Sequence, residues 1–142
     1  MDDLLSARVQ DLAQAIRKRQ ISPVDVVDAH IARISTTHAR INAVVVQRFD
    51  AARSEAREAE KQIMRASDSD ILPPLLGVPC TVKEFYGVKG MPQSAGIMSR
   101  KNVRATQDAE VVQRIRAAGA IVLGLTNVPE GGMWMETYNK IY

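Results

Sequence analysis

Apolar side chains recur at helical spacing from Leu5 to Ile63, through most of the first half of the chain. Intervals of three, four and seven positions are typical of amphipathic helices. Ser22-Pro23 predicts the start of the second helix, because a hydroxyl caps free amides and proline fits the first helical turn. The three stripes are Leu5, Val9, Leu12 and Ile16; Val24, Val27, Ile31 and Ile34; and Phe49, Ala52, Ala56, Ala59 and Ile63. Such helices form either a bundle of their own or layers around later segments.

The second half alternates short apolar runs with turn residues. In the first half, the β-branched run 42–46 favours an extended segment between the second and third helical stripes. Residues 78–82 and 120–123 are typical of buried strands. Residues 106–118 between them are predicted to be helical, with Thr106 or Asp108 as the cap. A strand, a helix and a strand at this spacing predict two parallel strands joined by a crossover.

Composition divides the chain near residue 71. All eight glycines lie from Gly77 to Gly132, and residues 1–70 carry 11 basic and 11 acidic side chains against 8 and 5 in residues 71–142. We therefore expect residues 1–70 to form a helical layer and residues 71–142 to begin an α/β core. Pro73-Pro74 predicts that the connection between them is not helical.

Charge and hydropathy exclude several classes of protein. The net charge is only +3, and the densest basic cluster, Arg17 to Arg19, is expected to be a solvated helix end, so no nucleic-acid partner is predicted. No apolar run approaches the length of a transmembrane helix. The acidic first residues are unlike a signal peptide, so the default location is cytoplasmic.

Few residues here are suited to metal or cofactor chemistry. His30 and His38 lie about 12 Å apart if both are helical, too far to share one ion. Cys80, the only cysteine, lies inside an apolar run and is expected to be a structural thiol rather than a nucleophile. Neither of the glycine-rich phosphate-binding patterns is present, so no cofactor is predicted.

Lys83 is the residue with the clearest candidate chemistry. It follows the apolar run 78–82 directly, where an unpaired ammonium group is costly to desolvate. One interpretation is a structural lysine paired with Glu84. The other is a buried lysine held neutral, which could take a proton from a hydroxyl group.

Residues 74–84, PLLGVPCTVKE, resemble the segment around the catalytic lysine of the amidase signature family. Residues 91–96 and 139–142 are most similar to its fatty-acid amide hydrolase 2 group and bacterial relatives. The resemblance continues in residues 87–91, 108–112, 116–127, 129–130 and 138–142, and more loosely in 22–27 and 41–43.

The resemblance implies an α/β fold, the N-terminal part of an α/β/α sandwich with a mixed sheet. It assigns Lys83 to a triad with two serines, one in a cis peptide and one the nucleophile, that hydrolyses amides through an acyl-enzyme without a cofactor. The glycine- and serine-rich stretch that carries both serines does not occur in these 142 residues, and Ser94 and Ser99 do not match it. We therefore expect one partial domain, inactive alone, of a longer enzyme.

The resemblance also suggests a substrate wall at residues 130–135. Gly132, Met133 and Trp134 are the candidates for the acyl side of the pocket, and they would favour an apolar acyl group. The alternative is an aromatic cluster packed in the core.

Three functions stay open at this point. The first is an amidase with a small-molecule amide substrate, with a homodimer of the full-length enzyme left open. The second is the amidotransferase subunit that makes amide-charged tRNA. The third is a non-catalytic fragment or helical interaction module, since no complete nucleophilic triad is present.

Overall fold

The computed structural model describes residues 2–67 and 69–142. Within these residues three helices come first and are followed by alternating strands and helices, and two short 3₁₀ turns lie at Met98–Arg100 and Glu130–Gly132. The helices are α1 (Asp2–Ser6), α2 (Val9–Arg17), α3 (Pro23–Ile41), α4 (Phe49–Arg65) and α5 (Glu110–Ala117). The strands are β1 (Val44–Gln47), β2 (Pro79–Lys83) and β3 (Ile121–Thr126).

The sheet is mixed and has β3 at its centre, in the order β1-β3-β2. β2 runs parallel to β3, which confirms the predicted crossover, and β1 runs antiparallel to it. Gly124 is required in the middle strand, because a Cβ there would lie 2.3 Å from the carbonyl oxygen of Val46. Only glycine therefore allows β1 and β3 to approach this closely.

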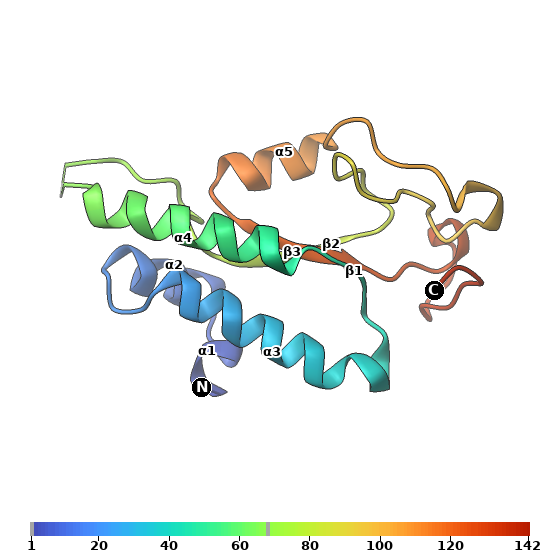
Figure 1. Ribbon diagram of the computed structural model, residues 1–142, viewed down its shortest axis with the longest axis horizontal. Coiled ribbons are helices and arrows are strands. Elements are labelled where there is room, and N and C mark those ends of the chain that lie inside the picture. The colour runs from blue at the N-terminus through green and yellow to red at the C-terminus, as the bar shows by residue number, and fades with distance from the viewer. Residues whose placement is uncertain (1, 68) are drawn as a thin grey trace.

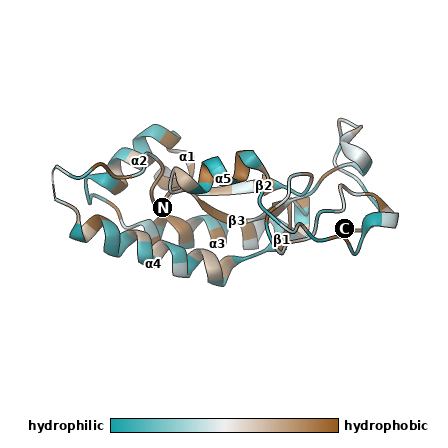
Figure 2. Cartoon of the chain, turned by 90° about the horizontal axis from the view of Figure 1, so that it is seen from above, coloured by the Kyte–Doolittle hydropathy of each residue, from teal (hydrophilic) through white to brown (hydrophobic). Residues whose placement is uncertain are grey.

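Helices cover both faces of the sheet. α3 and α4 lie on one side of the strands and α5 on the other (Figure 1). The apolar colour in Figure 2 runs along β3 and the hydrophilic colour gathers on the helices. The first face buries Val27, Ile31, Ala52, Ala56, Ile121 and Leu123, and the second buries Val82, Val88, Val112, Val122 and Leu125. The α/β class predicted from the sequence is confirmed.

The predicted start of α3 is also confirmed. The Ser22 hydroxyl accepts the backbone N–H of Val24 at 3.0 Å, and Pro23 occupies the first turn. The predicted first helix is wrong in one respect, because it is broken at Arg8, which is extended (φ −67°, ψ 146°). Val9, assigned to the buried stripe, is therefore exposed.

The predicted start of α5 is wrong by a few residues. The helix begins at Glu110 rather than near Thr106, and Asp108 is not its cap. The Asp108 carboxylate instead accepts the backbone N–H of Lys89 at 2.7 Å and pairs with Arg116 at 3.1 Å. A charged partner and a loop amide thus compete successfully with the helix terminus for this side chain.

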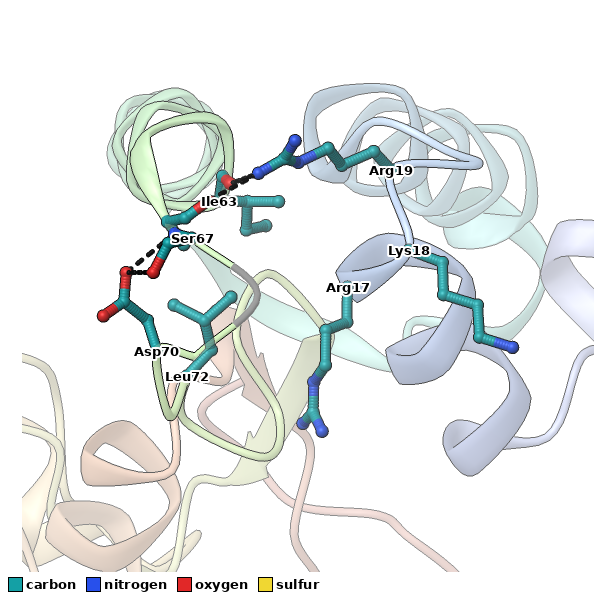
Figure 3. Close-up of a pocket in the computed structure, with 8 residues that line it drawn as sticks. Arg17, Lys18, Arg19, Ile63, Ser67, Asp70 and Leu72 are labelled. Carbon is teal, nitrogen blue, oxygen red and sulfur yellow. Dashed lines mark hydrogen bonds between the residues drawn. The ribbon is translucent and has the colours of Figure 1, made fainter.

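The basic cluster 17–19 is a helix end, as predicted. It borders a hollow of about 300 Å³ between the ends of α2 and α4 (Figure 3). The Arg19 guanidinium donates to the carbonyl oxygens of Ile63 at 3.0 Å and Ala66 at 2.7 Å. Arg19 therefore satisfies carbonyl groups that the C-terminus of α4 leaves without a helical partner.

Candidate active site

Lys83 is the last residue of β2, and its side chain is exposed. Its Nζ donates to the carbonyl oxygen of Asn127 at 3.4 Å, just beyond the end of β3. Lys83 thus lies at the carboxyl end of a parallel strand pair, the edge at which open α/β sheets bind ligands.

The pairing of Lys83 with Glu84 that the structural interpretation assumed is wrong. The Glu84 side chain is completely buried, and its carboxylate is engaged elsewhere. Oε1 accepts the backbone N–H and the hydroxyl of Ser94, each at 2.7 Å, and Oε2 accepts the backbone N–H of Ala95 at 2.8 Å. Val82 and Glu84 are buried while Lys83 is exposed, because successive strand side chains point to opposite faces.

Tyr142 supplies a further donor to the same carboxylate. Its hydroxyl donates to Glu84 Oε1 at 3.0 Å. Burial, reinforced by the negative charge and hydrogen bond of Glu84, raises the pKa of Tyr142 to about 12. The phenol therefore keeps its proton and remains a donor at neutral pH.

Asn139 ties the last residues to the end of β3. Its Nδ2 donates to Asn127 Oδ1 and to the Val128 carbonyl oxygen, both at 2.7 Å. Its Oδ1 accepts the backbone N–H groups of Ile141 at 2.8 Å and Tyr142 at 2.9 Å. All four hydrogen bonds of this buried amide are therefore made within the chain.

The sequence did not single out Glu84, Asn139 and Tyr142, which form the hydrogen-bond network next to the end of β3. The alternation after Val82 was a signal that could have placed Glu84 on the inner face of the strand. No local pattern would have tied Asn139 or Tyr142 to this network, because the acceptors to which their side chains donate lie 11 to 58 positions away.

The predicted substrate wall is exposed. The Met133 and Trp134 side chains are 84% and 70% exposed, so the alternative of a core-packed cluster is wrong. Both line an open hollow of about 320 Å³ together with Pro129, Glu130, Glu136, Tyr138, Asn139 and Lys140. Gly132 lies beside the ring of Phe85 in a left-handed conformation, φ +69°. A role for Gly132, Met133 and Trp134 in substrate binding stays a prediction.

The structure also bears on Cys80, on metal binding and on membrane-spanning helices. Burial raises the pKa of the Cys80 thiol, and the positive charges of Arg116 and Arg48 only partly offset this, which supports a structural thiol. Within the described ranges 2–67 and 69–142, no group of three side chains is arranged to hold a metal ion. The described helices include none long and apolar enough to cross a bilayer.

The chain has a mixed sheet between helical layers, which is an α/β architecture (Figure 1). Solved enzyme structures have the same arrangement over the matched region. The structure of a 6-aminohexanoate cyclic dimer hydrolase with its substrate matches with a TM-score of 0.80 and 33% identity, covering 98% of this chain and 27% of that one. A family model described as Amidase matches residues 25–142. The chain belongs to the amidase family.

Curated relatives agree with this assignment. Fatty-acid amide hydrolase 2-B of Danio rerio is 43% identical over 98% of this chain. A glutamyl-tRNA(Gln) amidotransferase protein of Salinispora tropica is 35% identical over 96% of it. The chain spans 27% of the length of each of these relatives.

Proposed function

We propose that this chain is the lysine-bearing N-terminal portion of an enzyme that hydrolyses carboxylic or fatty-acid amides. The observation that carries the proposal is the position of Lys83, exposed at the carboxyl end of β2 beside the Asn127 carbonyl. At this position its side chain is open to a hydroxyl group supplied by other polypeptide, with which it would exchange a proton. Membership of the amidase family supports this role.

In the proposed mechanism Lys83 takes a proton from one serine, which takes a proton from a second serine. The second oxygen attacks the amide carbonyl carbon, the C–N bond breaks, and the amine leaves with a proton. Water then cleaves the resulting ester and regenerates the serine. The proposal assigns both serines to polypeptide outside these 142 residues, and it requires no cofactor.

The proposed acyl-binding wall is formed by Gly132, Met133 and Trp134. Methionine and tryptophan provide an adaptable apolar surface, which fits an alkyl chain better than a charged one. The exposure of Met133 and Trp134 beside an open hollow supports this assignment. The similarity to a fatty-acid amide hydrolase of Danio rerio agrees with it.

The first test replaces the lysine in the complete natural polypeptide that carries this sequence. Lys83→Met is expected to lower kcat for amide hydrolysis by about 10²–10⁴-fold, because a general base is lost. Lys89→Met, a change at an exposed lysine in the following loop, is the matched control and should retain activity. Unchanged kcat in Lys83→Met would contradict the proposal.

A serine-directed fluorophosphonate gives an independent readout of the same proposal. The complete polypeptide should be labelled, whereas residues 1–142 alone should not. A labelled serine within these residues would contradict the assignment of both serines to another segment.

The amidotransferase function is the second candidate, supported by the 35% identity to the Salinispora tropica protein. Glutamine-dependent amide transfer to charged tRNA, with partner subunits that co-purify, would favour it over hydrolysis. An intact mass near 15.6 kDa in the source cells would favour the non-catalytic interpretation instead.

Three further expectations remain predictions. They are the cytoplasmic location, a homodimer of the full-length enzyme, and the division of the chain between residues 70 and 71.

A further inference from the structure

Residues 132–138 form a loop near the end of the chain (Figure 1). Most of its side chains are apolar, and they are exposed. Beyond Met133 and Trp134, the side chains of Met135 and Tyr138 are 94% and 74% exposed. Side chains this exposed contribute little packing within the chain. The position of the loop therefore depends on the contacts that hold its two ends.

The first end is held by the turn at residues 94–96. The backbone N–H of Gly131 donates to the carbonyl oxygen of Ala95 at 2.8 Å. Gly96 packs so closely that a Cβ would lie 3.0 Å from the carbonyl oxygen of Val128 and 3.2 Å from Glu130. Any displacement of this turn would therefore displace the start of the loop.

The turn does not have a relaxed backbone of its own. Ala95 has φ +55° and Gly96 has φ +71°, and the left-handed conformation is unfavourable for alanine because its Cβ crowds the following carbonyl oxygen. The Glu84 carboxylate binds the two successive amides of Ser94 and Ala95, one on each oxygen. These charge-assisted hydrogen bonds stabilise the turn in its strained conformation.

The second end of the loop is held by the same carboxylate. The hydroxyl of Tyr142 donates to Glu84 Oε1, and the adjacent Asn139 fixes the backbone of residues 141 and 142. Glu84 thus contacts the turn that holds the first end of the loop and the Tyr142 hydroxyl four residues beyond the second. Its own backbone is held independently, because its N–H donates to the Thr126 carbonyl oxygen at 2.9 Å.

We propose that Glu84 is a positioning residue that fixes both ends of the loop 132–138 and thereby sets the preference of the enzyme for long acyl chains. The inference rests on the proposed amidase function and on the wall formed by Met133 and Trp134. Glu84 acts through the turn 94–96 and through Tyr142, and it does not touch the substrate. We expect Lys83 to keep its position when the Glu84 side chain changes, because its Nζ contacts Asn127 and its backbone pairs with β3.

Glu84→Gln in the complete polypeptide is the decisive variant. Glutamine keeps the shape but replaces one acceptor oxygen by an NH₂ group, so at least one amide or hydroxyl of the network loses its acceptor. Decanoyl and acetyl p-nitroanilides share a leaving group and differ only in the acyl chain. We expect KM for the decanoyl substrate to rise roughly tenfold, with KM for the acetyl substrate and both kcat values within about twofold.

Two further variants complete the experiment. Tyr142→Phe releases only the second end of the loop, and we expect a rise of about threefold in the decanoyl KM alone. Glu58→Gln is the matched control, since it makes the same change on the exposed face of α4, where Glu58 pairs with Lys61. If Glu84→Gln does not fold, Tyr142→Phe decides the inference.

The kinetic outcomes separate the positioning role from plain stability. A purely structural role would lower kcat for both substrates in the same proportion, through loss of folded enzyme, and that result would overturn the inference. An unchanged ratio of the two KM values in a folded Glu84→Gln variant would overturn it as well.

Trp134 provides a readout that does not depend on activity. Its fluorescence anisotropy, isolated by subtraction of the Trp134→Phe protein, should fall in Glu84→Gln because the loop loses an anchor. Unchanged anisotropy would overturn the positioning role. The wild-type protein could hydrolyse neither anilide while the anisotropy of Trp134 still falls in Glu84→Gln. That result would contradict the proposed amidase function and would still support the anchoring of the loop by Glu84.

Discussion

Lys83 and Glu84 are neighbours in the chain with opposite surroundings. The amine is exposed at the edge of the sheet, while the carboxylate is buried and fully hydrogen-bonded. The pleat of the strand points the two side chains to opposite faces, so Glu84 binds Ser94, Ala95 and Tyr142 rather than Lys83. Lys83 is left open to solvent, and Glu84 is committed to holding the backbone of residues 94 and 95.

The buried hydroxyl of Tyr142 makes folding sensitive to alkaline pH. An unfolded tyrosine titrates near its ordinary pKa of 10, whereas the folded value is about 12. The folded state therefore binds this proton more tightly, and its contribution to stability is complete below pH 10 and lost as pH rises through about 12. Urea midpoints of the wild-type protein should fall across this window more steeply than those of Tyr142→Phe. Equal slopes would contradict the shifted titration.

At the scale of single residues, the sequence singled out Lys83 as a candidate but not the network beside it. A lysine at the end of an apolar run is a local signal. The contact between Glu84 and Tyr142 joins positions 58 residues apart, and only the folded backbone brings them together. The expected burial of Lys83 was wrong for a related reason, because the strand alternates faces and the lysine has the outward position.

The end of α4 depends on a side chain from a different element. Arg19, just after α2, donates to the carbonyl groups of Ile63 and Ala66 and thereby completes the last turn of α4 (Figure 3). A cation at this position also interacts favourably with the helix dipole. The hydrogen bonds thus tie together the ends of two helices that are not neighbours in the sequence.

Arg19→Ala should lower the free energy of unfolding by about 1–2 kcal/mol, since two carbonyl groups lose a charged donor. Lys18→Ala, at an exposed neighbouring position, should change it by less than about 0.5 kcal/mol. Urea denaturation of the two variants side by side measures the difference. Equal effects of both substitutions would show that Arg19 acts only through general charge.

Helices and strands with strong periodicity were predictable from the sequence, but two of their boundaries were not. The break at Arg8 interrupts a continuous apolar stripe, and Val9 fits the stripe even though it is exposed. Aspartate is a common helix-capping residue, but the carboxylate of Asp108 binds the Lys89 amide and the Arg116 side chain instead. In both places tertiary surroundings override a local preference.

At the scale of the molecule, the sheet joins the two halves that composition separates. β1, from the glycine-free half, pairs with β3 from the glycine-containing half. The composition break was visible in the sequence, but the pairing of β1 with β3 across it was not. A single sequence holds no local pattern that shows which distant strand a given strand pairs with. The parallel pair β2 and β3 was predictable because a helix of suitable length connects them.

The sheet as described has two edge strands, β1 and β2. Edge strands and exposed apolar side chains favour association between chains. Residues 1–142 prepared alone should therefore scatter light increasingly with concentration on heating and lack a sharp unfolding transition. A sharp, reversible transition by calorimetry, independent of concentration, would contradict this expectation.

The central position of β3 in the described sheet also constrains how the chain is made. β1 is complete at Gln47, but its partner β3 begins only at Ile121, after α4, β2 and α5 have been synthesised. A ribosome needs roughly 4–15 s to cover that interval at its usual elongation rate. During that time α3 and α4 can already pack together, while β1 and β2 have no strand between them. β1 and β2 thus stay unpaired until β3 has left the ribosome. A chaperone that shields apolar segments would act on the nascent chain during this interval.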